Sequence, residues 1–263
     1  LGVVGAGIST LTARILMFAA FAVLFYRSLR YRRYLVGYKR GKYNFTDILS
    51  LNKMGWMVGL QMGLETALFS ITGIMIGWLG SIALAAHQVV VAISTLGFMI
   101  YYGVGAAVSV RVSNYFGRQD LLHVRRTTMA GFHLILCLAV CACTVFLFSR
   151  ELIGYLFTTS EEVIRVVSTL VYILLAYQFG DALQITYANS LRGIGDVISM
   201  AVISFIGYFL IAMPVCYICG FVLEWGITGI WIGYPIGLTL TGVMLCGRYY
   251  WKLKTKTQSK EFY

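Results

Sequence analysis

Long apolar runs separated by short polar connections extend along the whole chain. Seven of these runs hold about 20 or more mostly apolar residues, the length that a helix needs to cross a bilayer. They lie near residues 1–26, 54–78, 88–112, 129–149, 163–188, 198–222 and 227–251. Short segments of alternating polarity, typical of membrane β-barrels, are missing from the sequence. The pattern therefore predicts an all-α polytopic membrane protein with seven transmembrane helices.

The composition supports this class. Of the 263 residues, 59% are hydrophobic and only 12% are charged, and the mean hydropathy is +0.81. A soluble domain carries about 25% charged residues. The connections are also too short to hold a separate soluble domain.

The distribution of basic residues predicts the orientation of the chain. Of 21 lysines and arginines, 18 lie in or beside the connections that follow the first, third, fifth and seventh runs. Two more flank the connection that follows the fourth run, and Arg14 lies within a run. The positive-inside rule places the 18 in the cytoplasm. The chain is then expected to begin outside and to end inside, with a basic cytoplasmic linker at 27–52 and a cytoplasmic tail at 252–263. The net charge of +11 thus reflects a lipid bilayer as partner rather than a nucleic acid.

Two acidic residues lie deep within apolar runs. Glu65 is 12 residues from Lys53, and Asp181 is 11 residues from Arg192. If Lys53 and Arg192 mark the water boundary, each acid lies roughly 16–18 Å into the bilayer, near its middle. A carboxyl group at that depth is costly and is either functional or a hydrogen-bonding link between helices. Both interpretations stay open at this point.

A polar stripe accompanies the two acids. On one helix Tyr177, Asp181 and Gln184 share a face, and on the other Gln61 lies one turn before Glu65. Carboxylate and phenol oxygens suit a hard cation such as Na⁺, and two carboxyl groups brought close together away from water favour a shared proton. The sequence therefore predicts a site for Na⁺ or H⁺, supported by Gln61 and Gln184. It predicts no other metal site, because the Cys216/Cys219 pair lies within an apolar run without further ligands.

Two prolines interrupt the last apolar runs. Pro214 and Pro235 each remove one backbone hydrogen bond. Broken helices near the middle of the bilayer are common in transporters, but a packing kink explains the prolines equally well.

Three stretches resemble helices of the multidrug and toxic compound extrusion (MATE) family. Residues 63–69 with 84–88 resemble its seventh helix and the loop that follows, residues 102–117 its eighth helix, and residues 178–193 its tenth helix with the next turn. The resemblance covers essentially the whole chain. Glu65, Gln178 and Asp181 indicate the NorM-like branch rather than the DinF-like branch.

This resemblance implies a two-lobe, twelve-helix antiporter in a cell inner membrane, not an enzyme, which exports cationic amphipathic drugs. Its implied coupling ion is Na⁺ or H⁺, and no cofactor is expected. In this branch a glutamate, an aspartate and a tyrosine form the cation site of the C-terminal lobe, and they match Glu65, Asp181 and Tyr177. The functional acid of the N-terminal lobe has no counterpart in this sequence. The resemblance therefore does not decide whether the coupling ion is Na⁺ or H⁺.

An internal repeat places the chain within such a protein. Gly2, Gly5 and Ile8 recur as Gly226, Gly229 and Ile232. Residues 1–26 are therefore interpreted as the last helix of an N-terminal lobe, and residues 53–251 as a C-terminal six-helix lobe. The expected partner is the rest of that N-terminal lobe, and the chain is not expected to transport alone.

Two other functions fit part of the pattern. A seven-span receptor agrees with the topology, but no lysine lies between Lys53 and Lys252 to hold a retinal in the last spans. A lipid-precursor flippase of the same superfamily would favour basic residues inside the spans, where only Arg14 is found. An ATP-driven pump is disfavoured because no phosphate-binding Gly-x-x-x-x-Gly-Lys loop is present.

Overall fold

A computed structural model describes residues 2–28 and 44–261. Contacts divide the chain into two units, Leu1–Leu51 and Asn52–Tyr263. The described part contains seven helical spans that are long and apolar enough to cross a membrane, as predicted. The main helices are α1 (Gly2–Arg27), α3 (Phe45–Gly77), α4 (Ser81–Gly117), α5 (Leu121–Phe148), α6 (Arg150–Phe157), α7 (Glu161–Gly193) and α10 (Gly226–Glu261).

Two helices extend beyond the predicted runs. Helix α3 begins at Phe45, within the segment expected to be a linker, because the Asn44 side chain accepts a hydrogen bond from the backbone N–H of Thr46 at 3.1 Å. Asp47 in the first turn also favours a helix start at this point. Helix α10 continues to Glu261, so most of the expected tail is helical.

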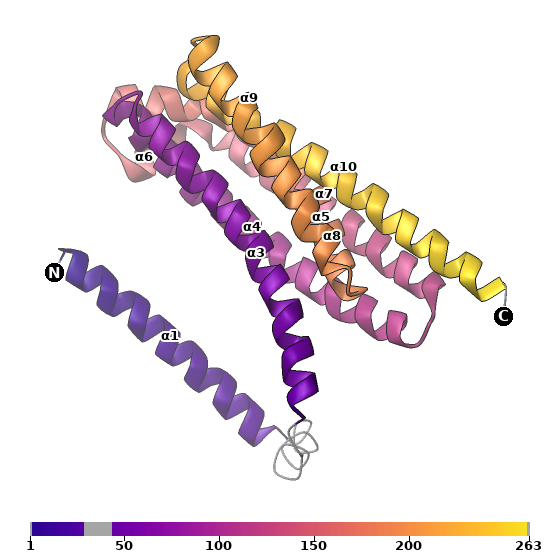
Figure 1. Cartoon of the computed structure of the whole chain (residues 1–263). Coiled ribbons are helices and arrows are strands. Elements are labelled where there is room, and N and C mark those ends of the chain that lie inside the picture. The colour runs from indigo at the N-terminus through magenta and orange to yellow at the C-terminus, as the bar shows by residue number, and fades with distance from the viewer. Residues whose placement is uncertain (1, 29–43, 262–263) are drawn as a thin grey trace. The chain divides into compact units, whose positions relative to one another are not determined.

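Helix α7 forms the centre of the second unit. It packs closely against α10, α4 and α5, and α6 also lies against it. Figure 1 shows these long helices running beside one another, with the orange α8–α9 segment next to the yellow α10. Nineteen residues of α7 are buried, including Gln178, Asp181 and Gln184. The polar side chains of α7 are therefore enclosed by the neighbouring helices.

Small residues allow α7 and α10 to approach closely. A side-chain carbon added at Gly180 would lie 2.8 Å from the Thr239 Oγ1 and 3.1 Å from the Thr239 backbone nitrogen. One added at Gly242 would lie 3.0 Å from the backbone nitrogen of Gln184. Glycine at these positions therefore permits the backbone contact that holds the two helices together.

The span before α10 is continuous but locally widened. It consists of α8 (Val197–Phe205), the π-helical segment η2 (Ile206–Ala212), α9 (Met213–Tyr217) and the π-helical segment η3 (Ile218–Val222). Pro214 lies in α9, between the two wide segments, and lacks the donor that a regular helix needs. Pro235 lies inside the unbroken α10. Both prolines thus reside in continuous helical spans.

Helix α3 packs less closely against this unit than α4, α5, α7 and α10 pack against one another. The closest helix pairs of this unit are α7–α10, α4–α7, α4–α5 and α5–α7. The Phe69 ring of α3 stacks on Tyr234 of α10 with centroids 4.8 Å apart, and the Thr72 hydroxyl hydrogen-bonds to the Tyr234 hydroxyl. This arrangement leaves room between α3 and α4.

Candidate functional site

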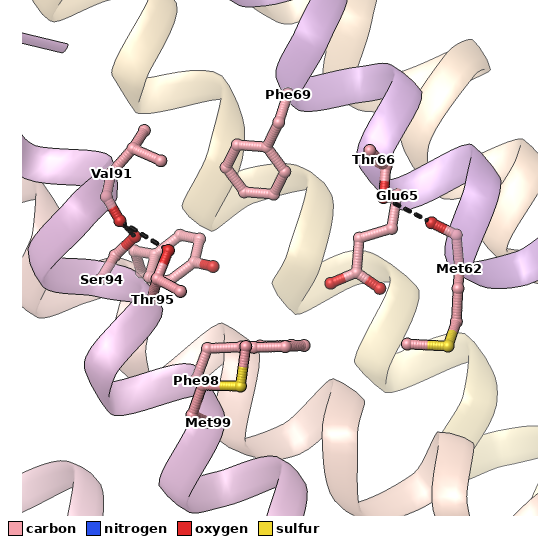
Figure 2. A pocket seen from close by; sticks show the side chains of 10 residues that line it. Met62, Glu65, Thr66, Phe69, Val91, Ser94, Thr95, Phe98 and Met99 are labelled. Atoms are coloured by element: carbon pink, nitrogen blue, oxygen red, sulfur yellow. Dashed lines mark hydrogen bonds between the residues drawn. The ribbon is translucent and has the colours of Figure 1, made fainter. Parts of the chain in front are cut away.

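A pocket of about 250 Å³ lies between α3 and α4, with α7 contributing to its wall. Figure 2 shows the Glu65 side chain extending toward this space, with Phe69 and Phe98 on either side of it. The other lining side chains are Met62, Thr66, Val91, Ser94, Thr95, Met99 and Tyr177. Glu65 is the one lining residue with a charged side chain. The pocket therefore combines a mostly apolar surface with one carboxyl group.

Two amides hold the Glu65 carboxyl group. Gln61 Nε2 donates to Glu65 Oε2 at 3.2 Å, and Gln184 Nε2 donates to the same oxygen at 3.4 Å. Gln184 also hydrogen-bonds to the hydroxyl of Tyr208, which lies in η2. Among the side chains that the structure describes, no lysine or arginine nitrogen lies within 4.0 Å of a Glu65 carboxylate oxygen. The carboxyl group thus has donors but no paired cation.

Arg192 occupies an unexpected position near this group. Its Nη2 donates to Gln61 Oε1 at 3.3 Å, while Nη1 donates to Asn189 Oδ1 at 3.3 Å and to the Tyr102 hydroxyl at 3.4 Å. An arginine has only donors, so it turns the oxygen of Gln61 toward itself and the amide nitrogen toward Glu65. Arg192 was expected to mark the water boundary, whereas its side chain joins α7 to α3 and α4.

Asp181 lies behind the pocket rather than in its wall. Its exposed fraction is 0%, and neither carboxyl oxygen has a hydrogen-bond partner among the described residues. A buried carboxyl group without donors is expensive, so a proton, a cation or water must satisfy it.

Tyr177 faces the pocket together with Glu65. It is 3% exposed, and its ring meets Phe69 edge-on with centroids 6.5 Å apart. The structure thus brings Glu65, Gln61, Gln184 and Tyr177 together, and places Asp181 beside them but outside the pocket lining.

Two residues of this network, Arg192 and Tyr208, are not predicted from the sequence. For Tyr208 a signal was present, because a buried phenol in the middle of an apolar run normally has a hydrogen-bond partner. For Arg192 there was none, since spacing along a helix does not show where a long side chain turns.

The two carboxyl groups limit which metal ions this region could hold. Within the described ranges, no group of three or more His, Cys, Asp or Glu residues is arranged as a metal site. Two carboxyl groups with amide and phenol oxygens are instead a donor set suited to a single hard cation or a proton.

Comparison with known proteins identifies the family. The sequence model of the MatE family matches residues 58–218. The chain belongs to the MatE family. The match contains Glu65, Tyr177 and Asp181, and it confirms the resemblance drawn from the sequence. The seven candidate spans and this family together make the MatE chain an integral membrane protein.

Curated relatives and solved structures agree with this assignment. The multidrug resistance protein NorM of Photobacterium profundum is 33% identical over 270 residues, covering 100% of this MatE chain and 58% of the relative. NorM of Aliivibrio fischeri is 32% identical, and the match covers 98% of this chain and 57% of that relative. The chain thus spans between half and two thirds of the length of these relatives.

The solved structures show the same fold. The eukaryotic MATE transporter AtDTX14 superposes with a TM-score of 0.83 at 20% identity, covering 97% of this chain and 59% of that one. A MATE protein in complex with MaL6 also gives a TM-score of 0.83, at 15% identity, with coverage of 98% and 58%. At these identities the likeness establishes the fold alone.

Proposed function

We propose that this chain is the ion-coupling lobe of a secondary antiporter that exports cationic amphipathic compounds in exchange for Na⁺ or H⁺. The observation that carries the proposal is the position of Glu65. Its carboxyl group lies in the wall of a pocket otherwise formed by aromatic, methionine and small side chains, with Asp181 buried close behind. The NorM relatives are multidrug resistance proteins, which supports the export of drugs.

The pocket has the chemistry to bind varied organic cations. The rings of Phe69 and Phe98 can attract a positive charge through their faces. Met62 and Met99 are flexible and polarisable, which suits ligands of different shape. The volume of about 250 Å³ is slightly below the roughly 300–1,000 Å³ of pockets that enclose a drug-sized ligand. A second lobe facing this pocket would supply the remaining wall.

Exchange follows from competition for the same carboxyl group. Glu65 is held by two neutral amides, so it can neutralise either a coupling cation or a cationic substrate. Occupation by one disfavours the other because both need the single negative charge that faces the pocket. This competition links uptake of the ion to release of the compound.

Transport is proposed to need an N-terminal lobe of the same protein. The chain covers 58% of the Photobacterium profundum relative, and alternating access requires one bundle to rock against another. In this arrangement residues 1–26 complete the N-terminal lobe. The distribution of lysine and arginine supports a C-terminus in the cytoplasm and, for a bacterial protein, insertion in the inner membrane.

A flippase function receives less support from the pocket. Lipid precursors carry phosphate groups, which call for basic side chains. The residues that line the Glu65 pocket include a carboxyl group and no lysine or arginine. Arg192 lines a smaller neighbouring pocket, and its guanidinium group already donates hydrogen bonds to Gln61, Asn189 and Tyr102.

Efflux from vesicles tests the proposal. Residues 1–263, co-expressed with the N-terminal lobe of the Photobacterium profundum relative, should export a fluorescent lipophilic cation when a Na⁺ or H⁺ gradient is imposed. Glu65→Gln and Asp181→Asn should each reduce the rate to background, and Tyr177→Phe should reduce it less. Glu151→Gln is the matched control, because the Glu151 side chain is 76% exposed.

Two results would contradict the proposal. Efflux at the normal rate in both acid variants would remove the coupling role of Glu65 and Asp181. Strong gradient-driven efflux by residues 1–263 alone, without a dimer detectable by crosslinking, would show that no second lobe is needed.

A further inference from the structure

Arg192 is linked to Glu65 through a single amide. Arg192 Nη2 donates to Gln61 Oε1 at 3.3 Å, and Gln61 Nε2 donates to Glu65 Oε2 at 3.2 Å. Arg192 and Glu65 also line one small hollow of about 20 Å³, which has room for one water molecule. The positive charge of Arg192 therefore lies one side chain away from the carboxyl group that is proposed to bind cations.

Gln61 can serve this link in only one orientation. An arginine has donors alone, so Gln61 turns its oxygen toward Arg192 and its NH₂ group toward Glu65. The amide thus presents a donor to the carboxyl group, at the place where a hard cation would take an oxygen ligand. In the absence of Arg192 the amide is free to rotate and to offer its oxygen to a cation.

A second contact connects Arg192 to the aromatic wall of the pocket. Arg192 Nη1 donates to the Tyr102 hydroxyl at 3.4 Å and to Asn189 Oδ1 at 3.3 Å. The Tyr102 ring stacks on Phe98 with ring centroids 5.7 Å apart, and Phe98 lines the Glu65 pocket. Among the described residues no carboxylate oxygen lies within 4.0 Å of an Arg192 nitrogen. The charge of Arg192 is therefore not neutralised by a direct ion pair.

We propose that Arg192 is a positioning residue that weakens cation binding at Glu65, so that a bound cation can leave. Its charge repels the cation, and its hydrogen bond holds the Gln61 amide with the donor toward Glu65. A pathway that moves ions needs binding that is strong enough for entry and weak enough for exit. This assignment deepens the proposed export function, and it rests on Glu65 as the group that binds cations in that function.

Binding of ethidium, a fluorescent organic cation, to the purified chain in detergent tests the assignment. Arg192→Gln removes the charge and keeps a polar side chain. It should tighten binding by about tenfold, because a unit charge one amide away changes the affinity for a cation by about that factor in a protein interior. The change should appear mainly as slower dissociation. Arg192→Lys keeps the charge and should bind ethidium within about threefold of the unaltered chain.

Two measurements separate this role from a purely structural one. Arg192→Gln loses hydrogen bonds to α3 and α4, so its melting temperature should fall while its affinity rises, whereas a structural defect would lower both. The double variant Arg192→Gln/Glu65→Gln should bind ethidium no more tightly than Glu65→Gln alone, since Arg192 acts on the cation at Glu65. Arg165→Gln changes an exposed arginine near the other end of α7. It is the matched control and should change neither the melting temperature nor the affinity.

Three outcomes decide the matter. Unchanged or weaker ethidium binding in Arg192→Gln, or binding by neither chain, would overturn the assignment, while efflux by the co-expressed lobes that is lost in Glu65→Gln would still support the export function. Equal tightening with and without the Glu65 carboxyl group would also overturn the assignment. Tighter binding that depends on Glu65, without gradient-driven efflux by the two lobes, would retain the role of Arg192 and refute the export function.

Discussion

Asp196, in the turn between α7 and α8, binds two basic side chains from the C-terminal half of α10. Arg248 Nε donates to Asp196 Oδ2 at 2.8 Å, Ser199 Oγ donates to Oδ1 at 2.9 Å, and Lys252 Nζ lies 3.9 Å from Oδ2. The Asp196 side chain is 9% exposed and that of Arg248 is 28% exposed. We expect Asp196→Asn to destabilise the protein, because it removes the negative charge while keeping the size of the side chain.

The magnitude follows from the partners that are lost. A hydrogen bond to a charged group contributes about 1.5–3 kcal/mol, and partial exposure of Arg248 favours the lower end. We therefore expect a loss of about 1.5–2 kcal/mol in the free energy of unfolding. For a chain of this size that is a fall of roughly 3–8 °C in melting temperature. Tryptophan fluorescence during heating in detergent measures it.

The effect should depend on pH in one direction. Burial raises the pKa of Asp196, but the hydrogen bonds from Arg248 and Ser199 and the charges of Lys252 and Arg248 outweigh it, so the pKa lies below its ordinary value of 3.8. A carboxyl group with a lowered folded pKa stabilises the protein above its unfolded pKa of about 3.9, and this contribution is lost as the pH falls through the folded pKa. The difference from Asp196→Asn should be constant between about pH 5 and 8 and should shrink below about pH 4.

Asp120 offers a matched control. It also precedes a helix, and its side chain accepts from the backbone N–H of His123 at 3.1 Å and lies 2.6 Å from His123 Nδ1, but 38% of the side chain is exposed. Asp120→Asn should lower the melting temperature much less. The double variant Asp196→Asn/Arg248→Gln should cost less than the sum of the single changes, since both remove one contact. Equal effects at Asp196 and Asp120, or full additivity, would refute the reasoning.

Three further predictions concern the pocket, the helix contact and the topology. Phe69→Ala and Phe98→Ala should weaken binding of a fluorescent organic cation, measured by fluorescence polarisation, by about fivefold or more. Binding of ²²Na⁺ should change less, and an equal effect on both ligands would contradict the pocket assignment. Gly180→Val should lower the melting temperature by several degrees, because its methyl groups would strike α10 at Thr239, whereas Gly103→Val, which meets open space, should not. In a background without the native cysteines, Ser81→Cys should react with an impermeant thiol reagent from outside and Lys254→Cys should not; the reverse pattern would overturn the orientation.

Part of this architecture can be predicted because it depends only on the length and spacing of residues along the sequence. Apolar runs of sufficient length predicted all seven spans, since a bilayer demands about 20 apolar residues of any helix. Helical spacing placed Gln61 next to Glu65, one turn away, and the structure gives their hydrogen bond. The role of Glu65, Asp181 and Tyr177 in ion binding stays a prediction.

The remaining features depend on packing that spacing does not encode. Tyr208 approaches Gln184 from η2, where the helix departs from the regular period on which face assignments rest. Arg192 turns inward because Gln61, Asn189 and Tyr102 offer acceptors from three directions, which involves two other helices. The start of α3 at Phe45 depends on a cap from Asn44 that a hydrophobicity pattern does not register.

The central position of α7 has a consequence for how the protein is made. A chain enters the membrane in the order of its synthesis, so α7 arrives when α4 and α5 are already present and α10 is not. At about 5–20 residues per second, the ribosome needs on the order of 4–16 s to proceed from Asp181 to Glu261 at the end of α10. During that interval α10 cannot yet shelter the polar face of α7 from lipid, whereas α4 and α5, which pack closely against α7, are already present. We therefore expect changes that loosen the α4–α5 hairpin to lower the yield of inserted protein before they alter any function of the finished molecule.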